Sequence, residues 1–499
     1  MRQDPNLDET EGVRIRKVDL NPKKDEPLTG RKHNMELSIA AWIFVLLFAL
    51  LIGRVVWINV FEAESLRNNI NNTKADSNSD NIIRGDIRTL DGTVLATTLV
   101  DENGNQTRSY PYDNVFAHVV GYASNGKSGM EAEENYALLS SHSSLLKQIR
   151  AGETGEKVQG DRVVVTLDEK LQQTAYYALG SYKGAVVVME PDSGKILAMV
   201  SKPDFNPNFI GMEWENLVSD TSSSALLNRA TQGLYPPGST FKMITTLAYL
   251  RAHPTDYSSF SWNCEGALSQ GDVTITCYGD QKHGMEDLGG AFSNSCNTAF
   301  AQIGLDLDNG QFRKTAEEFL FNHALPTSMQ HSQSIFKLTK DSSSGEQMTT
   351  AIGQGDTLVT PLHMALVTST IANGGIMMRP YYVDHIETND GTIVKQYDPE
   401  IYKKVLTPDE AGILTDYMKR TAESGTAAAL SGNGYTVAGK TGSAEYESNG
   451  VTGTHSWFCG FAQTSEPHIA IAVIAEDGGT GSATAVPIAK QILDAFFYG

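Results

Sequence analysis

Ser239 and Lys242 stand three residues apart in the stretch YPPGSTFKMITT (residues 235–246), where a helix is expected to begin. Three residues make nearly one helical turn, so the two side chains lie on one face of that helix. A serine hydroxyl attacks a carbonyl when a neighbouring base takes its proton, and a lysine is such a base when its pKa is lowered by burial or by a nearby cation. The pattern is common on helix surfaces, so its meaning depends on the rest of the chain.

Two further short motifs follow in the chain. Ser295, Cys296 and Asn297 form an S-x-N arrangement in a region that reads as a helix start, and Lys440 opens a K-T-G arrangement at the end of an expected strand. We expect Ser295 to relay a proton to a leaving amine. We expect Asn297 to hydrogen-bond Lys242 or a substrate amide, and Lys440 to be a second cation near Lys242. The predicted catalytic set therefore has five members: Ser239 as the nucleophile, Lys242, Ser295, Asn297 and Lys440.

The K-T-G segment also predicts how a substrate is held. Thr441 and Ser443 offer hydroxyl groups and Lys440 a positive charge to a substrate carboxylate. Gly442 permits close approach of a peptide laid along the strand edge. The backbone N–H groups of Ser239 and Ser443 are the expected oxyanion hole.

The order S-x-x-K, S-x-N, K-T-G resembles that of penicillin-interacting serine enzymes. The chain as a whole is similar to monofunctional class B penicillin-binding proteins, and its short N-terminal domain resembles that of the penicillin-binding protein A type. The further matching stretches lie at residues 84–96, 129–131, 228–233, 353–356, 360–361 and 455–458.

The resemblance implies an activity and its partners. It implies a serine-type D-Ala-D-Ala transpeptidase that cross-links peptidoglycan stem peptides through an acyl-enzyme at Ser239 and is acylated by β-lactams. It also implies work beside a polytopic membrane glycosyltransferase of the SEDS class. The segment before residue 160 is too short for a glycosyltransferase domain, which disfavours a bifunctional class A protein.

The elements that must position these residues are strands early and late with helices between, which favours an α+β domain. We expect a hairpin over residues 184–200, strands over 435–440, 456–462 and 469–476, and a closing helix over 487–497. The resemblance implies helices packed on a five-stranded antiparallel sheet. We divide the chain into a tail (1–36), a transmembrane helix (37–60), a small dimerisation-like pedestal (61–158, with a helix over 130–150) and a transpeptidase domain (159–499).

Residues 37–60 are mostly apolar, with Arg54 as their one charged residue, and the run is long enough to cross a membrane. The preceding segment is rich in Lys and Arg, so the positive-inside rule places residues 1–36 in the cytoplasm and the remainder outside. A cleaved signal peptide is the alternative, but the run is long, begins late and has no small-residue cleavage site after it.

The composition limits which classes of ligand and partner the chain is expected to bind. A formal net charge of −20 disfavours nucleic-acid binding, which needs basic surface. We expect no cofactor and no metal ion, because the four cysteines contain no C-x-x-C pair. Cys264 and Cys277 flank a short polar loop, so a disulfide between them and a pair of free thiols both remain open.

Other readings of the same residues compete. A β-lactamase or D,D-carboxypeptidase uses the same three motifs with water as the acceptor. A membrane-anchored β-lactam sensor or an inactive wall-binding scaffold is the non-enzyme alternative. Cys296 as a small core residue and His455 as a structural residue are favoured over catalytic roles.

Overall fold

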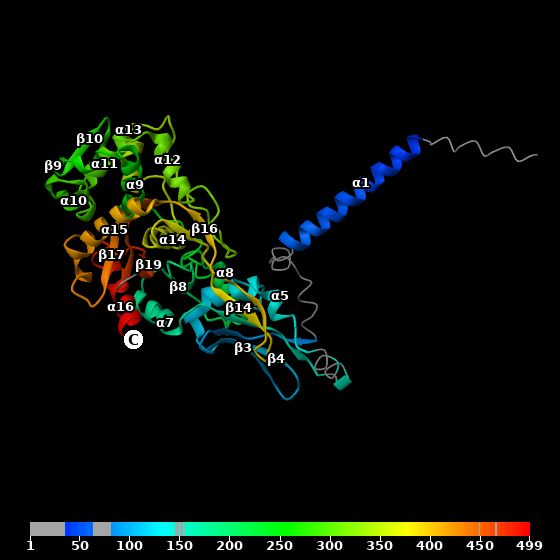
Figure 1. Ribbon diagram of the computed structural model, residues 1–499. Coiled ribbons are helices and arrows are strands. Elements are labelled where there is room, and N and C mark those ends of the chain that lie inside the picture. The colour runs from blue at the N-terminus through cyan, green and yellow to red at the C-terminus, as the bar shows by residue number, and fades with distance from the viewer. Residues whose placement is uncertain are drawn as a thin grey trace, which may run out of the picture. The chain divides into compact units, whose positions relative to one another are not determined.

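The computed structural model describes residues 35–62, 81–144, 149, 153–154, 156–448, 450–464 and 467–499. The chain divides into two compact units, residues 1–65 and 66–499. Most of the tail expected over residues 1–36 lies outside the described residues. The second unit holds both the pedestal and the transpeptidase elements, coloured from light blue to red in Figure 1.

The first unit contains the helix α1 (Met35–Trp57), which continues into a π-helical turn at Ile58–Glu62. Its stretch Leu37–Val60 has a mean hydropathy of 2.6, and none of its residues is buried within the protein. An apolar helix of this length matches the thickness of a bilayer core. The structure thus confirms one apolar helix long enough to cross a membrane over residues 37–60, and its insertion in a membrane remains a prediction.

The part of the chain expected to be the transpeptidase domain is built on a five-stranded sheet with the order β17-β18-β19-β7-β8. Every neighbouring pair is antiparallel, which confirms the α+β fold class. Its strands are β7 (Gly184–Met189), β8 (Ile196–Lys202), β17 (Thr436–Ser448), β18 (Val451–Gln463) and β19 (Pro467–Ala475). The first two are the hairpin expected over residues 184–200, and the last three correspond to the expected late strands. The expected end of the first late strand at Lys440 is wrong, because β17 continues to Ser448 and the K-T-G motif lies within it.

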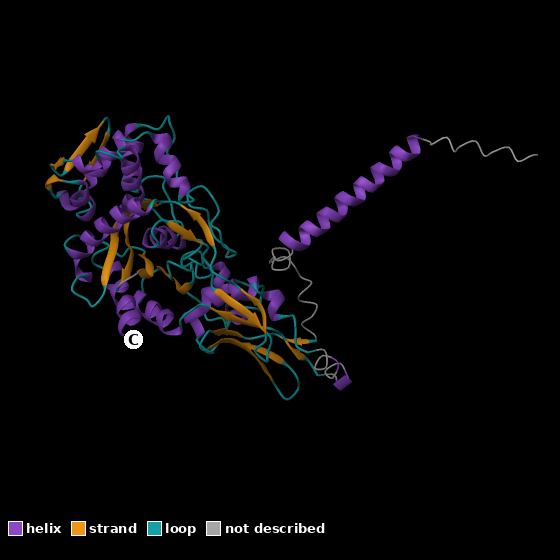
Figure 2. Cartoon of the chain, viewed as in Figure 1, coloured by secondary structure: helices purple, strands orange, loops and turns teal. Residues whose placement is uncertain are grey.

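Helices cover both faces of this sheet, as Figure 2 shows. On one face lies α14 (Pro361–Ala372), which is buried along its whole length and contacts β7, β18 and β19. On the other face lie α7 (Glu169–Leu179) and α16 (Ala485–Tyr498), which pack on each other and on the sheet. This double covering explains why β7 is buried at every residue and is rich in β-branched side chains.

Most of the remaining helices pack on one another, and they carry the first two motifs. The remaining helices are α8 (Ile210–Ser219), α9 (Lys242–Ala252), α10 (Leu288–Ser293), α11 (Asn297–Asp306), α12 (Asn309–Glu318), α13 (Ser344–Ala351) and α15 (Pro408–Glu423). Short strand pairs join them: β9 (Trp262–Cys264) with β12 (Gly284–Glu286), β10 (Ala267–Gln270) with β11 (Val273–Thr276), and β13 (Ile376–Met378) with β16 (Ile401–Lys404).

The pedestal has its own sheet of six strands, in the order β15-β14-β6-β2-β3-β4. They are β2 (Ile87–Thr89), β3 (Val94–Val100), β4 (Gln106–Ser109), β6 (Arg162–Val165), β14 (Val383–Glu387) and β15 (Ile393–Gln396). The short pair β1 (Ile82–Ile83) and β5 (Val158–Gln159) lies apart from this sheet. Three strands of the sheet thus come from beyond residue 158, where we placed the domain boundary. The division at 158/159 remains a prediction.

The helix expected over residues 130–150 is wrong in its length. Two short helices, α4 (Gly129–Glu133) and α5 (Asn135–Leu138), take its first part, and residues 140–144 have no helical structure. Ser140, Ser141 and Ser143 favour turns over helix interior, because their hydroxyls compete for backbone hydrogen bonds. Most of the part beyond residue 144 lies outside the described residues.

A buried ion cluster holds the pedestal together. Glu131 is fully buried and accepts hydrogen bonds from Arg84 at 2.5 Å and from Arg108 at 2.7 Å. Burial alone would raise the pKa of Glu131, but the two guanidinium groups outweigh it and hold that pKa below its ordinary value. Arg84 also donates to Asn135 at 2.6 Å, so the cluster ties strand, loop and helix segments together.

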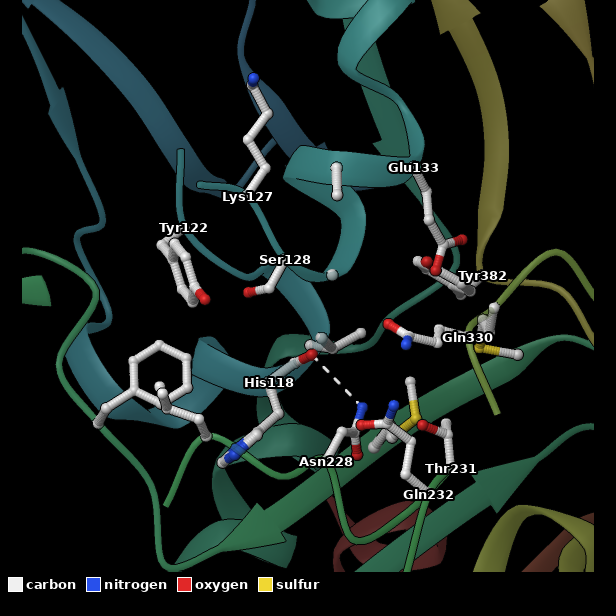
Figure 3. A pocket seen from close by; sticks show the side chains of 17 residues that line it. His118, Tyr122, Lys127, Ser128, Glu133, Asn228, Thr231, Gln232, Gln330 and Tyr382 are labelled. Atoms are coloured by element: carbon white, nitrogen blue, oxygen red, sulfur yellow. Dashed lines mark hydrogen bonds between the residues drawn. The ribbon is translucent and has the colours of Figure 1, made fainter. Parts of the chain in front are cut away.

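A polar cavity of about 240 Å³ lies where the pedestal meets the transpeptidase elements. Figure 3 shows Tyr122 and Ser128 on its pedestal side, with Asn228 and Gln232 opposite. The Asn228 amide donates to the carbonyl of His118 at 3.5 Å, so hydrogen bonds as well as packing join the two parts.

Candidate active site

Ser239 lies in a 3₁₀ turn, Gly238–Phe241, that leads directly into α9. Gly238 has φ +53, and a Cβ there would come within 3.1 Å of the Ala444 backbone on β17. The N–H of Gly238 donates to the carbonyl of Gly353 at 2.9 Å, which fixes the turn against the loop after α13. Glycine therefore permits the turn to approach β17 closely and leaves Ser239 half-buried beside that strand.

Lys242 is the first residue of α9 and is completely buried. Its Nζ donates to the carbonyl of Ser295 and to Oδ1 of Asn297, both at 2.8 Å. Burial lowers the pKa of Lys242 to about 8, although the thiols of Cys296 and Cys277 act in the opposite direction. A neutral amine has two N–H donors and one lone pair, so these two hydrogen bonds use both donors and leave the lone pair for a proton.

Ser295 joins the two lysines. Its Oγ lies 3.3 Å from Nζ of Lys242 and 2.9 Å from Nζ of Lys440. The backbone of Ser295 has φ +58, a left-handed conformation that is unfavourable for a residue with a side chain and is held by its surroundings. Such strain is frequent at functional sites. Asn297 is held in turn by a hydrogen bond from its Nδ2 to the carbonyl of Thr276 at 2.9 Å.

Lys440 and Thr441 lie on β17 and come to the same place from the far end of the chain. Lys440 is also completely buried. Burial and then the neighbouring charge of Lys242 lower the pKa of Lys440 well below its ordinary value. The Thr441 hydroxyl lies 2.5 Å from that of Thr426, which fixes its direction.

β17 is an edge strand of its sheet, so its outer backbone groups are open to a partner. In the orientation that satisfies its side-chain amide, Gln354 accepts from the N–H and donates to the C=O of Glu445, both at 3.1 Å. Outward-facing backbone groups recur every second residue in an antiparallel strand. The N–H and C=O of Ser443 therefore face the same side. A Cβ on Gly238 would meet the Ser443 carbonyl oxygen at 3.1 Å, which agrees with this direction.

Buried polar contacts support the serine turn from behind. Tyr235 and Arg229 both donate to Oε1 of Glu476 at 2.7 Å, and the indole of Trp457 donates to the carbonyl of Pro236 at 3.0 Å. His455 accepts from the N–H of Asp477 at 3.3 Å and stacks on the Tyr446 ring. These contacts give His455 a structural setting.

The structure places Lys242, Ser295, Asn297 and Lys440 in one set of contacts. It places Ser239 in the turn that packs against β17, the strand that carries Thr441, Gly442 and Ser443. Sequence reasoning missed Thr426, Thr276 and the role of Gln354, which act through single contacts that no motif marks. The four cysteines are free thiols, so the Cys264–Cys277 disulfide left open by the sequence is not formed. A half-buried serine in a turn against an open strand edge, together with two buried lysines that meet at Ser295, is the arrangement expected of a serine acyl-transfer enzyme.

Comparisons with known proteins agree with this class. Residues 184–494 match the penicillin binding protein transpeptidase domain, and residues 84–163 match the penicillin binding protein A dimerisation domain. The peptidoglycan D,D-transpeptidase PbpA of Mycolicibacterium smegmatis is 34% identical over 489 residues, which cover 93% of this chain and 99% of that protein. PbpA of Mycobacterium tuberculosis is 33% identical over 483 residues, covering 91% and 97%.

Solved structures show the same likeness. Penicillin-binding protein A from M. tuberculosis, as a ceftriaxone acyl-enzyme complex, has a TM-score of 0.77 and 31% identity, and the match covers 85% of this chain and all of that one. A D,D-transpeptidase domain from Eggerthella lenta has a TM-score of 0.75 and 32% identity, covering 83% and 98%. The chain belongs to the penicillin-binding protein transpeptidase family.

Proposed function

We propose that this protein is a peptidoglycan D,D-transpeptidase that cross-links stem peptides through an acyl-enzyme on Ser239 and is acylated there by β-lactams. The observation that carries the proposal is the contact of Ser295 Oγ with the Nζ atoms of both Lys242 and Lys440. The relatives' names and the acyl-enzyme structures support the reaction class.

In the first half-reaction, Ser239 Oγ attacks the carbonyl carbon of the D-Ala-D-Ala peptide bond. Lys242 takes the serine proton on its free lone pair, which its pKa of about 8 permits near neutral pH. The carbonyl oxygen becomes an oxyanion that the N–H groups of Ser239 and Ser443 stabilise. When the C–N bond breaks, Ser295 passes its hydroxyl proton to the leaving amine and takes the proton that Lys242 holds. Lys242 is then neutral again, and the acyl group remains on Ser239.

In the second half-reaction, the amine of another stem peptide attacks the acyl-enzyme. Lys242 accepts a proton from that amine, and the proton returns to Ser239 Oγ as the ester bond breaks. Asn297 keeps Lys242 in place throughout by accepting one of its N–H groups. Lys440, Thr441 and Ser443 hold the carboxylate of the donor peptide or of a β-lactam, and Gly442 lets the peptide lie close to β17.

We also propose that α1 anchors the chain with its N-terminus in the cytoplasm and the catalytic unit outside. The excess of Lys and Arg before residue 37 supports this orientation. A SEDS-class glycosyltransferase is the proposed partner, because a transpeptidase needs freshly polymerised glycan strands next to the membrane. Co-purification of such a protein with the full chain, lost when α1 is exchanged for an unrelated span, tests the partner.

The reaction class is tested with the full-length chain in detergent. Incubated with a donor peptide ending in D-Ala-D-Ala and an acceptor amine, it should release D-Ala and form the amide product. A long-lived adduct is expected with labelled penicillin. Rapid hydrolysis of penicillin would instead indicate a β-lactamase, and D-Ala release without amide product a carboxypeptidase. A long-lived adduct without amide product or D-Ala release would favour a β-lactam sensor, and absence of both adduct and product would favour an inactive scaffold.

A further inference from the structure

Three cysteines and one histidine gather beside the S-x-N motif. Cys264, Cys277, His283 and Cys296, the cysteine–histidine cluster, place one sulfur or nitrogen atom each within 4.8 Å of all the others. The three cysteines are buried and His283 is half-buried. Figure 1 shows their segments, β9 to α11, at the end of the transpeptidase part away from pedestal strands β3 and β4.

The distances match those of a tetrahedral metal site. Two thiolates at about 2.3 Å from a zinc ion, at the tetrahedral angle, have sulfur atoms about 3.8 Å apart, and a thiolate and an imidazole nitrogen are about 3.5 Å apart. The Sγ atoms of Cys264 and Cys277 are 3.7 Å apart, and those of Cys277 and Cys296 are 3.8 Å apart. Nδ1 of His283 lies 3.4 Å from Sγ of Cys264.

The surroundings orient these sulfur atoms. The Thr298 hydroxyl donates to Sγ of Cys264 at 3.3 Å and itself accepts from the Trp262 indole at 3.0 Å. Cys296 caps the N-terminus of α11, where its sulfur accepts from the N–H of Ala299 at 3.4 Å. Donors aimed at sulfur and a helix N-terminus both favour thiolates, and metal ligands are held by outer partners of this kind.

The segment that carries three of the four ligands has almost no core of its own. Within residues 261–286, all of which the structure describes, the buried apolar side chains are Cys264, Ile275 and Cys277. Two short strand pairs of this size are marginal in water without a covalent or metal link. A metal ion bound by the cluster would supply that link.

A disulfide explains the cluster less well. Cys264 and Cys277 could form one after a small movement, but Cys296 lies as close to Cys277 as Cys264 does. A disulfide therefore leaves a third thiol and His283 at the same point without a role. Four ligands converging on one point from four separate chain positions are what a closed structural metal site requires.

The cluster is also joined to the candidate active site from two directions. Cys296 is the middle residue of S-x-N, between Ser295 and Asn297. Thr276, whose carbonyl accepts from Asn297 Nδ2, directly precedes Cys277. Bonds from a metal to Cys296 and Cys277 would thus fix the residue that precedes Asn297 in the chain and the residue next to Thr276, its hydrogen-bond partner.

We propose that Cys264, Cys277, His283 and Cys296 bind one structural zinc ion, which positions Ser295 and Asn297 against Lys242. The zinc site goes beyond the proposed function and replaces the expectation of no metal, whereas its effect on catalysis rests on that function. Four protein ligands leave no open coordination position, so the metal has a positioning role and does not touch the substrate.

Metal content tests the site without any assay of activity. The full-length chain, purified in detergent after growth with zinc, should hold one zinc per chain by mass spectrometry of the element. Cys277→Ser and His283→Gln should lose it, while Cys459→Ser, a buried cysteine on β18 outside the cluster, should keep it. Cobalt in place of zinc should give thiolate charge-transfer and tetrahedral d–d bands in the wild type. If Cys277→Ser does not fold, His283→Gln still tests the site, because His283 is only half-buried and its replacement should disturb the fold less.

Two results would overturn the site. One is a metal-free wild type after zinc reconstitution, with a mass and peptide map that show a Cys264–Cys277 disulfide. The other is zinc that remains at full occupancy in both ligand variants.

The positioning role has its own readout. Removal of zinc by a chelator should lower the rate constant of acylation by penicillin about 10- to 100-fold, the cost of small misplacement at a reacting centre. The dissociation constant of the initial penicillin complex should change less than the rate constant, because the carboxylate site is built on β17, a strand outside the segments that carry the cluster. Added zinc should restore the rate.

An unchanged rate constant in zinc-free protein would refute the positioning role, and a loss of initial binding equal to the loss of rate would indicate general unfolding instead. If zinc is bound but no acylation occurs at all, the proposed function fails and the metal site stands.

Discussion

The pedestal and the transpeptidase part each bury charged side chains, but they treat them differently. In the pedestal, Glu131 is fully buried between Arg84 and Arg108, so charges of opposite sign meet at 2.5 and 2.7 Å. In the active site, Lys242 and Lys440 are fully buried near one another. Among the described residues, no carboxylate forms an ion pair with either lysine.

The difference separates a structural cluster from a functional one. A buried pair of opposite charges holds segments together, and its members keep their charges. Two buried cations without an anion are costly, and the protein reduces that cost by lowering their pKa values. We expect a pair of buried lysines where a reaction needs a neutral amine as base, as proposed for Lys242, or a binding site for a substrate carboxylate, as proposed for Lys440. The contrast predicts that mutations in the two clusters have opposite effects on stability and activity.

The largest effect is expected from Lys242→Met. Acylation by penicillin should slow by about 10²- to 10⁴-fold, because the base that takes the Ser239 proton is lost. The melting temperature should stay the same or rise by about 2–4 °C, the shift expected per kcal/mol in a domain of this size. Stopped-flow labelling and calorimetry measure the two quantities. A large fall in melting temperature would show that Lys242 is structural.

Glu131→Gln should do the reverse. Loss of the carboxylate leaves two buried guanidinium groups unpaired, so the free energy of unfolding should fall by about 3–5 kcal/mol. The acylation rate constant of the protein that remains folded should equal that of the wild type. Denaturant unfolding and labelling test this, and slower acylation in folded Glu131→Gln would mean that the two clusters are coupled.

Lys440→Ala is expected to have a smaller effect on acylation, about 10- to 100-fold, the usual size for loss of a charge-assisted contact. The loss should lie mainly in the initial complex with penicillin, because the side chain binds the drug's carboxylate. An unchanged rate would place the carboxylate contact elsewhere.

The pH profiles should differ as well. The acylation rate should rise about tenfold per pH unit below pH 8 and level off above it, because Lys242, with a pKa of about 8, must be neutral to act. Glu131 has a pKa below its ordinary value, so its contribution to stability is present above about pH 4.5 and is lost as the pH falls further. In Glu131→Gln this acid-dependent part should disappear. A flat acylation profile from pH 6 to 9 would contradict the role of Lys242.

The smallest effect is expected at an exposed pair. Lys337 and Asp356 form an ion pair at 3.1 Å with side chains 62% and 72% exposed. Asp356→Asn should change the free energy of unfolding by less than about 1 kcal/mol, because solvent screens the pair. A change as large as that of Glu131→Gln would show that burial does not determine how much an ion pair contributes to the free energy of unfolding.

Much of the site could be predicted because its residues occur in three motifs with local structural cues. The Pro-Pro-Gly sequence before Ser239 indicated a turn into a helix, and the alternating strands around Lys440 indicated a sheet. These cues act over a few residues, which is where sequence patterns are informative. The apolar helix α1 could equally be predicted from length and composition.

The contacts made by chain segments far apart could not be predicted. Gln354 on the edge of β17 and Thr426 beside Thr441 are ordinary polar residues in loops, and only the fold brings them there. The cysteine–histidine cluster was missed for the same reason, because its ligands are 13, 6 and 13 residues apart and form no short motif. The pedestal sheet takes β14 from residue 383 onward, which no local pattern records.

The most direct test of the account is the location of the acyl group. The full-length chain and its Ser239→Ala variant are incubated with a fluorescent penicillin, and intact mass followed by peptide mapping is measured for both. We predict one adduct per wild-type chain on the peptide that contains Ser239, and no adduct on a variant that melts at the same temperature. An adduct on another serine, or equal labelling of the variant, would contradict the assignment of the nucleophile and the mechanism built on it.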